Sequence, residues 1–237
     1  MSASEHVAVI TGATGGLGRV VARRLAQEGA RLALLAGDPG KLADLTSSLN
    51  LPTKRIHTLA VDLTDPASAR FAFESVRDRL GHPDLLLHFV GGWSGGQAVT
   101  DVDPADVSRM LDQHLWSTLY IVQAFVPAMV AQKWGRIVVI SSPTASRPAA
   151  LRVPYAVGKA AEEALMLTLS EELRETGVTA NSIVVSTIDV KHERASARKP
   201  GTPAWTTPEE IASMIVYLCS EEAGMVNGAR IPMYGSY

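Results

Sequence analysis

The chain alternates short, continuously apolar runs with longer helical patterns. The runs Leu85–Leu87 and Ile137–Ile140 are apolar at every position, as expected of parallel strands that helices bury on both faces. The alternation shows no internal repeat, low-complexity tract or linker. It therefore predicts an α/β fold in which helices cover both faces of a doubly wound, parallel, seven-stranded Rossmann-like sheet, giving three layers. We expect one domain over residues 1–237.

The pattern of apolar positions gives approximate limits for each element. We expect strands at Val7–Ile10, Arg31–Leu35, Ile56–Val61, Leu85–Val90, Arg136–Ile140, Val178–Val185 and Arg230–Met233. Helices are expected at Leu17–Glu28, Gly40–Leu49, Pro66–Leu80, Pro104–Gln132, Tyr155–Glu175 and Pro208–Ser220. The carboxyl ends of the strands, where such sheets bind ligands, fall at Gly12, Asp62, Gly91, Ser142 and Ile188.

A glycine-rich turn joins the first strand to the first helix. The sequence runs Thr11-Gly12-Ala13-Thr14-Gly15-Gly16-Leu17-Gly18. Glycines allow the backbone to turn tightly and to approach a pyrophosphate, and the free N–H groups at a helix start attract the anion. The turn therefore predicts a dinucleotide site.

Tyr155 and Lys159 are the candidate proton-transfer pair. At i,i+4 spacing they lie on one helix face, and an ammonium close to a phenol favours the phenolate. The pKa of a tyrosine is then lowered from about 10, which permits proton exchange with an alcohol near neutral pH. Ser142 lies thirteen residues upstream of Tyr155, at a strand end.

The order T-G-x-x-x-G-x-G, Ser, Y-x-x-x-K resembles the classical short-chain dehydrogenase/reductase family over essentially the whole chain. The resemblance implies that Ser142 bonds the substrate oxygen, Tyr155 is the general acid/base, and Lys159 holds the nicotinamide ribose. The Asn that completes the family's catalytic set aligns with His114, which can hold a water in the proton relay or interrupt it. The implied cofactor contacts are Gly12, Thr14, Gly16, Leu17, Gly18, Asp62, Leu63, Val90, Gly91, Tyr155, Lys159 and Ile188.

Other positions depart from the family pattern. The usual Asn-Asn-Ala-Gly is His88-Phe89-Val90-Gly91, the usual Pro-Gly after the sixth strand is Val185-Ser186, and a common Thr is Val190. At the end of the second strand, Ala36 replaces the acid that selects NAD(H), and Gly37 replaces the arginine that selects NADP(H). Because the carboxylate that would repel a 2′-phosphate is absent, we favour NADP(H) over NAD(H), although Asp38 lies close by.

These residues predict an NAD(P)(H)-dependent oxidoreductase that interconverts a carbonyl and a secondary alcohol. One alternative is a dinucleotide-binding sensor or partner protein that has lost turnover through the changes at His88, His114 and Val185-Ser186. Another is a pteridine-type reductase, because Gly91–Gly96 reads G-G-W-S-G-G, similar to dihydropteridine reductases. Ser142 counts against that reading. Lys159, where halohydrin dehalogenases use arginine, disfavours dehalogenation.

The composition of the chain argues against several other classes of protein. The net charge of −2 without a basic block argues against nucleic-acid binding, and a single cysteine, Cys219, excludes an intrachain disulfide and a cysteine metal cluster. We expect no metal and a cytoplasmic protein without a signal peptide. We interpret Leu115–Ala131 as a buried helix rather than a membrane span. The resemblance implies a tetramer or a dimer packed through the helices Pro104–Gln132 and Tyr155–Glu175, of which we expect the homotetramer. It also implies a substrate lid at Thr187–Trp205.

Overall fold

The computed structural model describes residues 6–194 and 205–235. A seven-stranded, wholly parallel sheet has the order β3-β2-β1-β4-β5-β6-β7. The strands are β1 Val7–Thr11, β2 Arg31–Ala36, β3 Ile56–Ala60, β4 Leu85–His88, β5 Gly135–Ser141, β6 Val178–Val184 and β7 Arg230–Pro232. The sequence-based fold class is confirmed.

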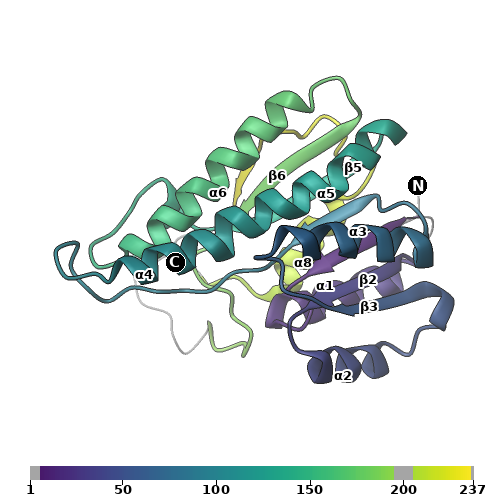
Figure 1. Cartoon of the computed structure of the whole chain (residues 1–237), viewed down its shortest axis with the longest axis horizontal. Coiled ribbons are helices and arrows are strands. Elements are labelled where there is room, and N and C mark those ends of the chain that lie inside the picture. The colour runs from purple at the N-terminus through teal and green to yellow at the C-terminus, as the bar shows by residue number, and fades with distance from the viewer. Residues whose placement is uncertain (1–5, 195–204, 236–237) are drawn as a thin grey trace.

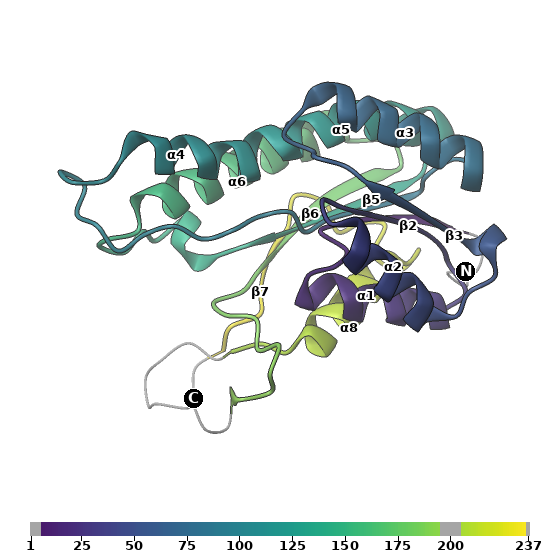
Figure 2. The same ribbon diagram turned by 60° about the horizontal axis from the view of Figure 1, so that its bottom comes forward.

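Helices cover both faces of this sheet (Figure 1; Figure 2). One layer holds α1 Gly16–Gln27, α2 Pro39–Leu49 and α8 Pro208–Leu218. The other holds α3 Pro66–Leu80, α4 Pro104–Leu111, the π-helical turn η3 Asp112–Trp116, α5 Ser117–Gln132 and α6 Val153–Glu172. Short 3-10 turns lie at η2 Thr53–Arg55 and η4 Pro143–Ala145.

Strand β1 shows how the sequence produces two cores. Val7 and Val9 pack into the α3–α5–α6 layer, whereas Ala8 and Ile10 pack into the α1–α2–α8 layer. Successive side chains of a strand point to opposite faces, so a strand between two helix layers buries the side chains of both its faces. All five residues of β1 are buried, which explains the continuous apolar run.

Most predicted limits agree with the structure to within three residues. Strand β4 ends at His88 instead of Val90. The predicted helix Pro104–Gln132 is continuous but contains the π-helical turn η3, and it is the one described helix long and apolar enough to cross a membrane. Phe125 and Met129 of this helix are fully buried against the sheet, so it packs as a core helix.

Candidate active site

Two adjoining cavities open along the carboxyl edge of the central strands. The first, of about 440 Å³, we call the Tyr155 cavity. The second, of about 530 Å³, we call the Ala36 cavity. They share Gly12, Gly15, Phe89, Val90 and Gly91. The predicted site residues Gly16, Leu17, Gly18, His114, Tyr155, Lys159 and Ile188 line the Tyr155 cavity, and Thr14, Asp62 and Leu63 line the Ala36 cavity.

Glycine is required at two positions of the turn between β1 and α1. Gly12 has a φ of +62°, and a Cβ there would lie 2.7 Å from the Phe89 carbonyl oxygen. A Cβ on Gly18 would lie 2.5 Å from the Gly12 carbonyl oxygen. Because these obstacles are backbone atoms, a side chain at either position would displace the turn. The result is a cradle free of side chains at the start of α1, which fits a pyrophosphate.

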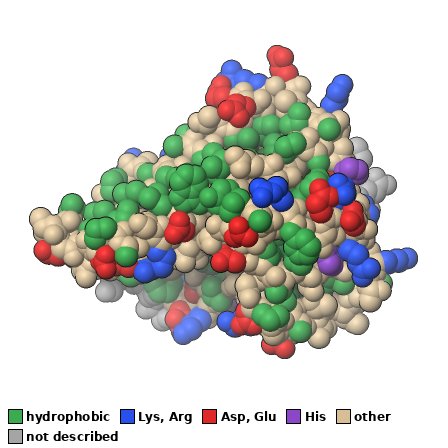
Figure 3. Space-filling model, viewed as in Figure 1, with side chains coloured by type: hydrophobic (Ala, Val, Ile, Leu, Met, Phe, Trp, Pro, Cys, Tyr) green, Lys and Arg blue, Asp and Glu red, His purple; other side chains and the backbone are tan. Residues whose placement is uncertain are grey.

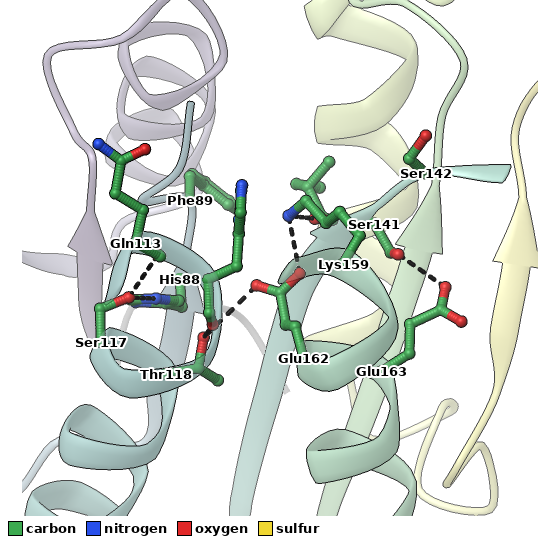
Figure 4. Close-up of polar contacts among 12 residues, drawn as sticks. His88, Phe89, Gln113, Ser117, Thr118, Ser141, Ser142, Lys159, Glu162 and Glu163 are labelled. Carbon is green, nitrogen blue, oxygen red and sulfur yellow. Dashed lines mark hydrogen bonds and ion pairs between the residues drawn. The ribbon is translucent and has the colours of Figure 1, made fainter. Parts of the chain in front are cut away.

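His88, at the end of β4, ties three elements together below this cradle. Its Nδ1 lies 2.8 Å from Thr11 Oγ1 and its Nε2 lies 3.1 Å from Ser117 Oγ (Figure 4). The Ser117 hydroxyl already donates to the Gln113 carbonyl, so Nε2 carries the ring proton and Nδ1 accepts from Thr11. Burial lowers the pKa of His88 to about 3, with a smaller contribution from Lys159. His88 is therefore neutral, and its two hydrogen bonds join β4 to β1 and to α5.

His114 lies in the π-helical turn η3, an irregularity that is common at functional sites. Its Nε2 donates to the Gly92 carbonyl at 3.1 Å, while Nδ1 is buried without a hydrogen-bond partner. Burial, followed by the charge of Lys159, lowers the pKa of His114 to about 3, so the neutral ring leaves Nδ1 as a free acceptor. Gly91 and Gly158 make room for the ring, since a Cβ on either would lie within about 3 Å of it.

Tyr155 and Lys159 project from the first turns of α6 into the same cavity. Tyr155 is half-buried, and its ring centroid lies 5.6 Å from that of His114 at 79°. Lys159 is buried, and its Nζ donates to the Ile140 carbonyl and to Glu162 Oε2, each at 2.7 Å (Figure 4). Lys159 is thus fixed between the end of β5 and its own helix.

The two serines after β5 have different partners. Ser141 Oγ donates to Glu163 Oε1 at 2.6 Å. Ser142 is buried, caps η4, and donates to Thr144 Oγ1 at 3.2 Å. Ser142 lies outside the lining of both cavities, whereas Ser141 contributes to the Tyr155 cavity. Of the predicted catalytic residues, the cavity therefore brings together Tyr155, Lys159 and His114, with Ser142 just beyond its wall.

The Ala36 cavity has few charged groups. Asp62 is exposed, and its Oδ1 accepts from the Thr64 amide and hydroxyl. Asp38 caps α2 by accepting from the Lys41 amide, and this bond is the main reason that its pKa is lowered. A Cβ on Gly37 would meet no atom within 4 Å, so this end of the cleft is open.

The segment after β6 closes the Tyr155 cavity from the α8 side. A parallel bridge joins Ile188 to Thr206, and buried Asp189 accepts from the Glu193 and Arg194 amides. The Val190 side chain lies over Gly16. Within the predicted lid, Arg194 pairs with Glu210 and His192 with Glu209. Residues 195–204 of the predicted lid, which include Arg198 and Lys199, lie outside the described residues.

Comparison with known proteins identifies the family of the chain. The family model described as short chain dehydrogenase matches residues 6–201. The chain belongs to the short-chain dehydrogenase family. Membership implies an oxidoreductase that uses an NAD(P)-type cofactor.

An uncharacterized oxidoreductase of Staphylococcus epidermidis is 31% identical to this short-chain dehydrogenase, over 78% of this chain and 79% of its own length. A D-beta-hydroxybutyrate dehydrogenase of Rhizobium meliloti is 27% identical over 97% of each chain. The crystal structure of a short chain dehydrogenase from Bacillus anthracis is 25% identical with a TM-score of 0.88, covering 98% of this chain and 96% of that one.

Sequence reasoning missed two residues of the site in this short-chain dehydrogenase. Glu162 is buried against Lys159, and Gly158 provides the space that His114 fills. Each residue can be recognised in the sequence. Glu162 is an acid three residues after Lys159 in an apolar helix, and Gly158 is a glycine inside the same helix. Neither signal indicates a partner without the packing of η3 against α6.

Proposed function

We propose that this protein interconverts a carbonyl and a secondary alcohol with NAD(P)(H). The observation that carries the proposal is the placement of Tyr155 and Lys159 in one cavity with the glycine cradle. A proton-transfer pair beside a dinucleotide site is the arrangement that carbonyl reduction needs.

The residues present fit the cofactor. The backbone of Gly12, Gly16 and Gly18 would hold the pyrophosphate, and Asp62 in the Ala36 cavity would hold the adenine amino group through the oxygen that Thr64 does not use. His114 Nδ1 is buried without a hydrogen-bond partner, so the His114 ring forms part of the cavity wall and binds no described group through that nitrogen. When bound, the nicotinamide supplies or accepts the hydride.

In the reductive direction, Tyr155 donates its hydroxyl proton to the carbonyl oxygen. The Lys159 ammonium favours the resulting phenolate by charge attraction. Ser142 would turn its hydroxyl from Thr144 to the substrate oxygen and so orient and polarise the carbonyl. The buried neutral ring of His114 lies edge-on to Tyr155 and excludes water on that side.

We further propose that both cofactors bind, with a modest preference for NADP(H). Ala36 and Gly37 line the Ala36 cavity and carry no charge that repels or attracts a 2′-phosphate. Asp38 is occupied at the start of α2, with its carboxylate bonded to the Lys41 amide and 3.4 Å from Lys41 Nζ. This engagement weakens the repulsion that Asp38 would otherwise exert on a phosphate.

We also propose a homotetramer. Hydrophobic side chains gather on the face over α4, α5 and α6 (Figure 3), and they include exposed Trp116, Val157 and Leu167. Other apolar residues of these two helices, such as Phe125, Met129 and Leu169, are buried in the core. Light scattering at micromolar concentration tests the proposal, and a monomeric mass would contradict it.

The function is tested by single-turnover oxidation of NADPH and NADH with a panel of aliphatic, aromatic and planar bicyclic carbonyls. We include planar compounds because Trp93 lines the Tyr155 cavity and is 62% exposed. Oxidation of the cofactor with at least one carbonyl is expected. Tight cofactor binding without oxidation across the panel would favour a sensor instead of an enzyme.

A further inference from the structure

A buried carboxylate contacts the proposed proton-transfer pair. Glu162 Oε2 lies 2.7 Å from Lys159 Nζ, and the two side chains are 1% and 7% exposed. The carboxylate's other contact is weak, because Thr118 donates its hydroxyl proton to the His114 carbonyl at 2.5 Å and lies 3.4 Å from Glu162 Oε1 (Figure 4). The charge of Glu162 is therefore balanced chiefly by Lys159.

The titratable groups on the elements that pack around Glu162 do not disturb the charge balance between Glu162 and Lys159. On β4 and η3, His88 and His114 are neutral near pH 7. On α6, Glu163 is paired with Arg230 of β7 at 2.8 Å. Tyr155 lies two turns before Glu162, and Glu171 and Glu172 lie more than two turns after it. Burial raises the pKa of Glu162, and Lys159 opposes that rise. Lys159 and Glu162 thus form a buried ion pair in which each charge neutralises the other, and Lys159 lines the same cavity as Tyr155.

Stability alone does not explain this pair. Removing two charges from water costs several kcal/mol per ion, and a buried ion pair is often no more stabilising than apolar residues of the same volume. An apolar side chain at position 162 would suit the buried face of α6, where Met166 and Leu169 are buried. What a carboxylate adds is a negative charge 2.7 Å from the Lys159 ammonium, on the helix that also carries Tyr155 two turns earlier.

We propose that Glu162 is a positioning residue for Tyr155 and Lys159. Its carboxylate holds the Lys159 ammonium charged and in place, and so determines the pH range over which Tyr155 keeps its proton. This inference rests on the proposed function for its catalytic consequence. The charge coupling itself is a property of the protein without cofactor.

The sign of the effect follows from electrostatics. A nearby negative charge raises the pKa of an ammonium and of a phenol alike, because it favours the more positive form of each. Replacing Glu162 by Gln keeps a hydrogen-bond acceptor for Lys159 but removes the charge. Both groups should then lose their protons at lower pH, Lys159 more than Tyr155, because Lys159 is in direct contact with the carboxylate.

The direct test is an ultraviolet titration of tyrosinate in the cofactor-free protein. The Tyr155 signal is obtained by subtracting the titration of a matching Tyr155→Phe protein from the parent, from Glu162→Gln and from Glu163→Gln. Glu163→Gln is the matched control, because it removes a neighbouring buried carboxylate that bonds Ser141 and Arg230 instead of Lys159. We expect the Tyr155 midpoint to fall in Glu162→Gln, because a negative charge is lost, and to fall by clearly less in Glu163→Gln. No shift, or equal shifts in both variants, would overturn the inference.

A second variant, Glu162→Asp, keeps the inference testable if Glu162→Gln does not fold. Glu162→Asp keeps the charge but withdraws it by one methylene, so its midpoint should fall in the same direction by a smaller amount. Circular dichroism and thermal unfolding establish that each variant is folded. An unchanged or raised midpoint in folded Glu162→Asp, if the Gln variant does not fold, would contradict the inference.

The catalytic consequence is measured in the pH profile of carbonyl reduction. The alkaline limb of kcat/KM should move to lower pH in Glu162→Gln by the amount seen in the titration, since reduction requires the protonated Tyr155. If no carbonyl is reduced, the proposed function fails while the titration still decides the role of Glu162. If reduction depends on Tyr155 but the limb does not move, the Glu162 inference fails alone.

Discussion

The Tyr155 cavity and the Ala36 cavity share one wall but are built in different ways. Around Tyr155, polar side chains are buried and held by specific bonds, such as those of Lys159 to Ile140 and Glu162. Around Ala36, the lining consists of glycines and apolar residues apart from Thr14 and Asp62, and Asp62 is exposed. Chemistry requires fixed groups, whereas binding an adenosine requires shape and a few hydrogen bonds.

This difference determines how each cavity responds to change. Buried charges interact strongly because water does not screen them, so substitutions near Tyr155 should alter rates and pH dependence. Substitutions near Ala36 act on exposed groups that salt screens, so they should alter cofactor choice.

Tyr155→Phe should remove the transferable proton while preserving the ring that packs edge-on against His114. Turnover should fall roughly 10²–10⁴-fold, as is typical for a general acid/base, and cofactor affinity should stay close to that of the parent. Steady-state kinetics on a verified substrate and a fluorescence titration of NADPH measure the two effects. Parental turnover in this variant would remove Tyr155 from the mechanism.

Gly37→Arg should raise the preference for NADPH over NADH. The position is open, and a guanidinium can make charge-assisted contacts to a 2′-phosphate worth about 1.5–3 kcal/mol, or about tenfold and more. Ala36→Asp is the opposite control, because its carboxylate should repel the phosphate. The measurement is the ratio of kcat/KM with NADPH to kcat/KM with NADH, at low and moderate salt. If this ratio is unchanged in both variants, the adenosine of the cofactor does not bind in the Ala36 cavity.

His88→Asn should weaken the pH dependence of stability. His88 has a pKa of about 3 when folded and about 6.5 when unfolded, so between these values only the unfolded chain takes up the proton. Stability therefore falls as pH drops from about 6.5 towards 3, by about 1.4 kcal/mol per pH unit for this residue. Urea unfolding between pH 6 and 4 should show a slope smaller by about that amount. His82→Asn, at an exposed position, should keep the parental slope, and equal slopes in all three proteins would refute this role.

Val190→Thr should strengthen cofactor binding slightly. Val190 lies over Gly16 at the start of α1, where a hydroxyl of the same shape can donate to a bound phosphate. A neutral hydrogen bond contributes about 0.5–1.5 kcal/mol, or roughly two- to tenfold in Kd. Fluorescence titration of NADPH measures the change, with Val190→Ala as the control that removes the contact without adding a hydroxyl. Weaker binding by the Thr variant would speak against a phosphate at this position.

The fold followed from the sequence because its signals are local. Continuous apolar runs such as Leu85–Leu87 identify strands between two helix layers, and the Gly12–Gly18 turn identifies where the first helix starts. The π-helical turn at Asp112–Trp116 left no such signal, because it arises where η3 packs against α6. The end of β4 at His88 likewise depends on bonds to Thr11 and Ser117, which are distant in sequence.

The site was less predictable than the fold. Spacing alone placed Tyr155 and Lys159 on one face of a helix, and the glycine turn indicated the dinucleotide cradle. The neutral state of His114 and the pairing of Lys159 with Glu162 required the tertiary structure, because burial and partners from other elements determine protonation. The catalytic assignment of Ser142 stays a prediction, as does the preference for NADP(H).

Transfer of a labelled hydride tests the central claim most directly. Single-turnover reduction of a carbonyl from the active panel would be run with NADPH deuterated at the transferring position of the nicotinamide, and the product analysed by mass spectrometry and NMR. We expect deuterium on the carbinol carbon of the alcohol, in the parent protein and, more slowly, in Tyr155→Phe. Oxidation of the cofactor without deuterium in the product, or a cofactor that stays reduced with every carbonyl, would contradict the account.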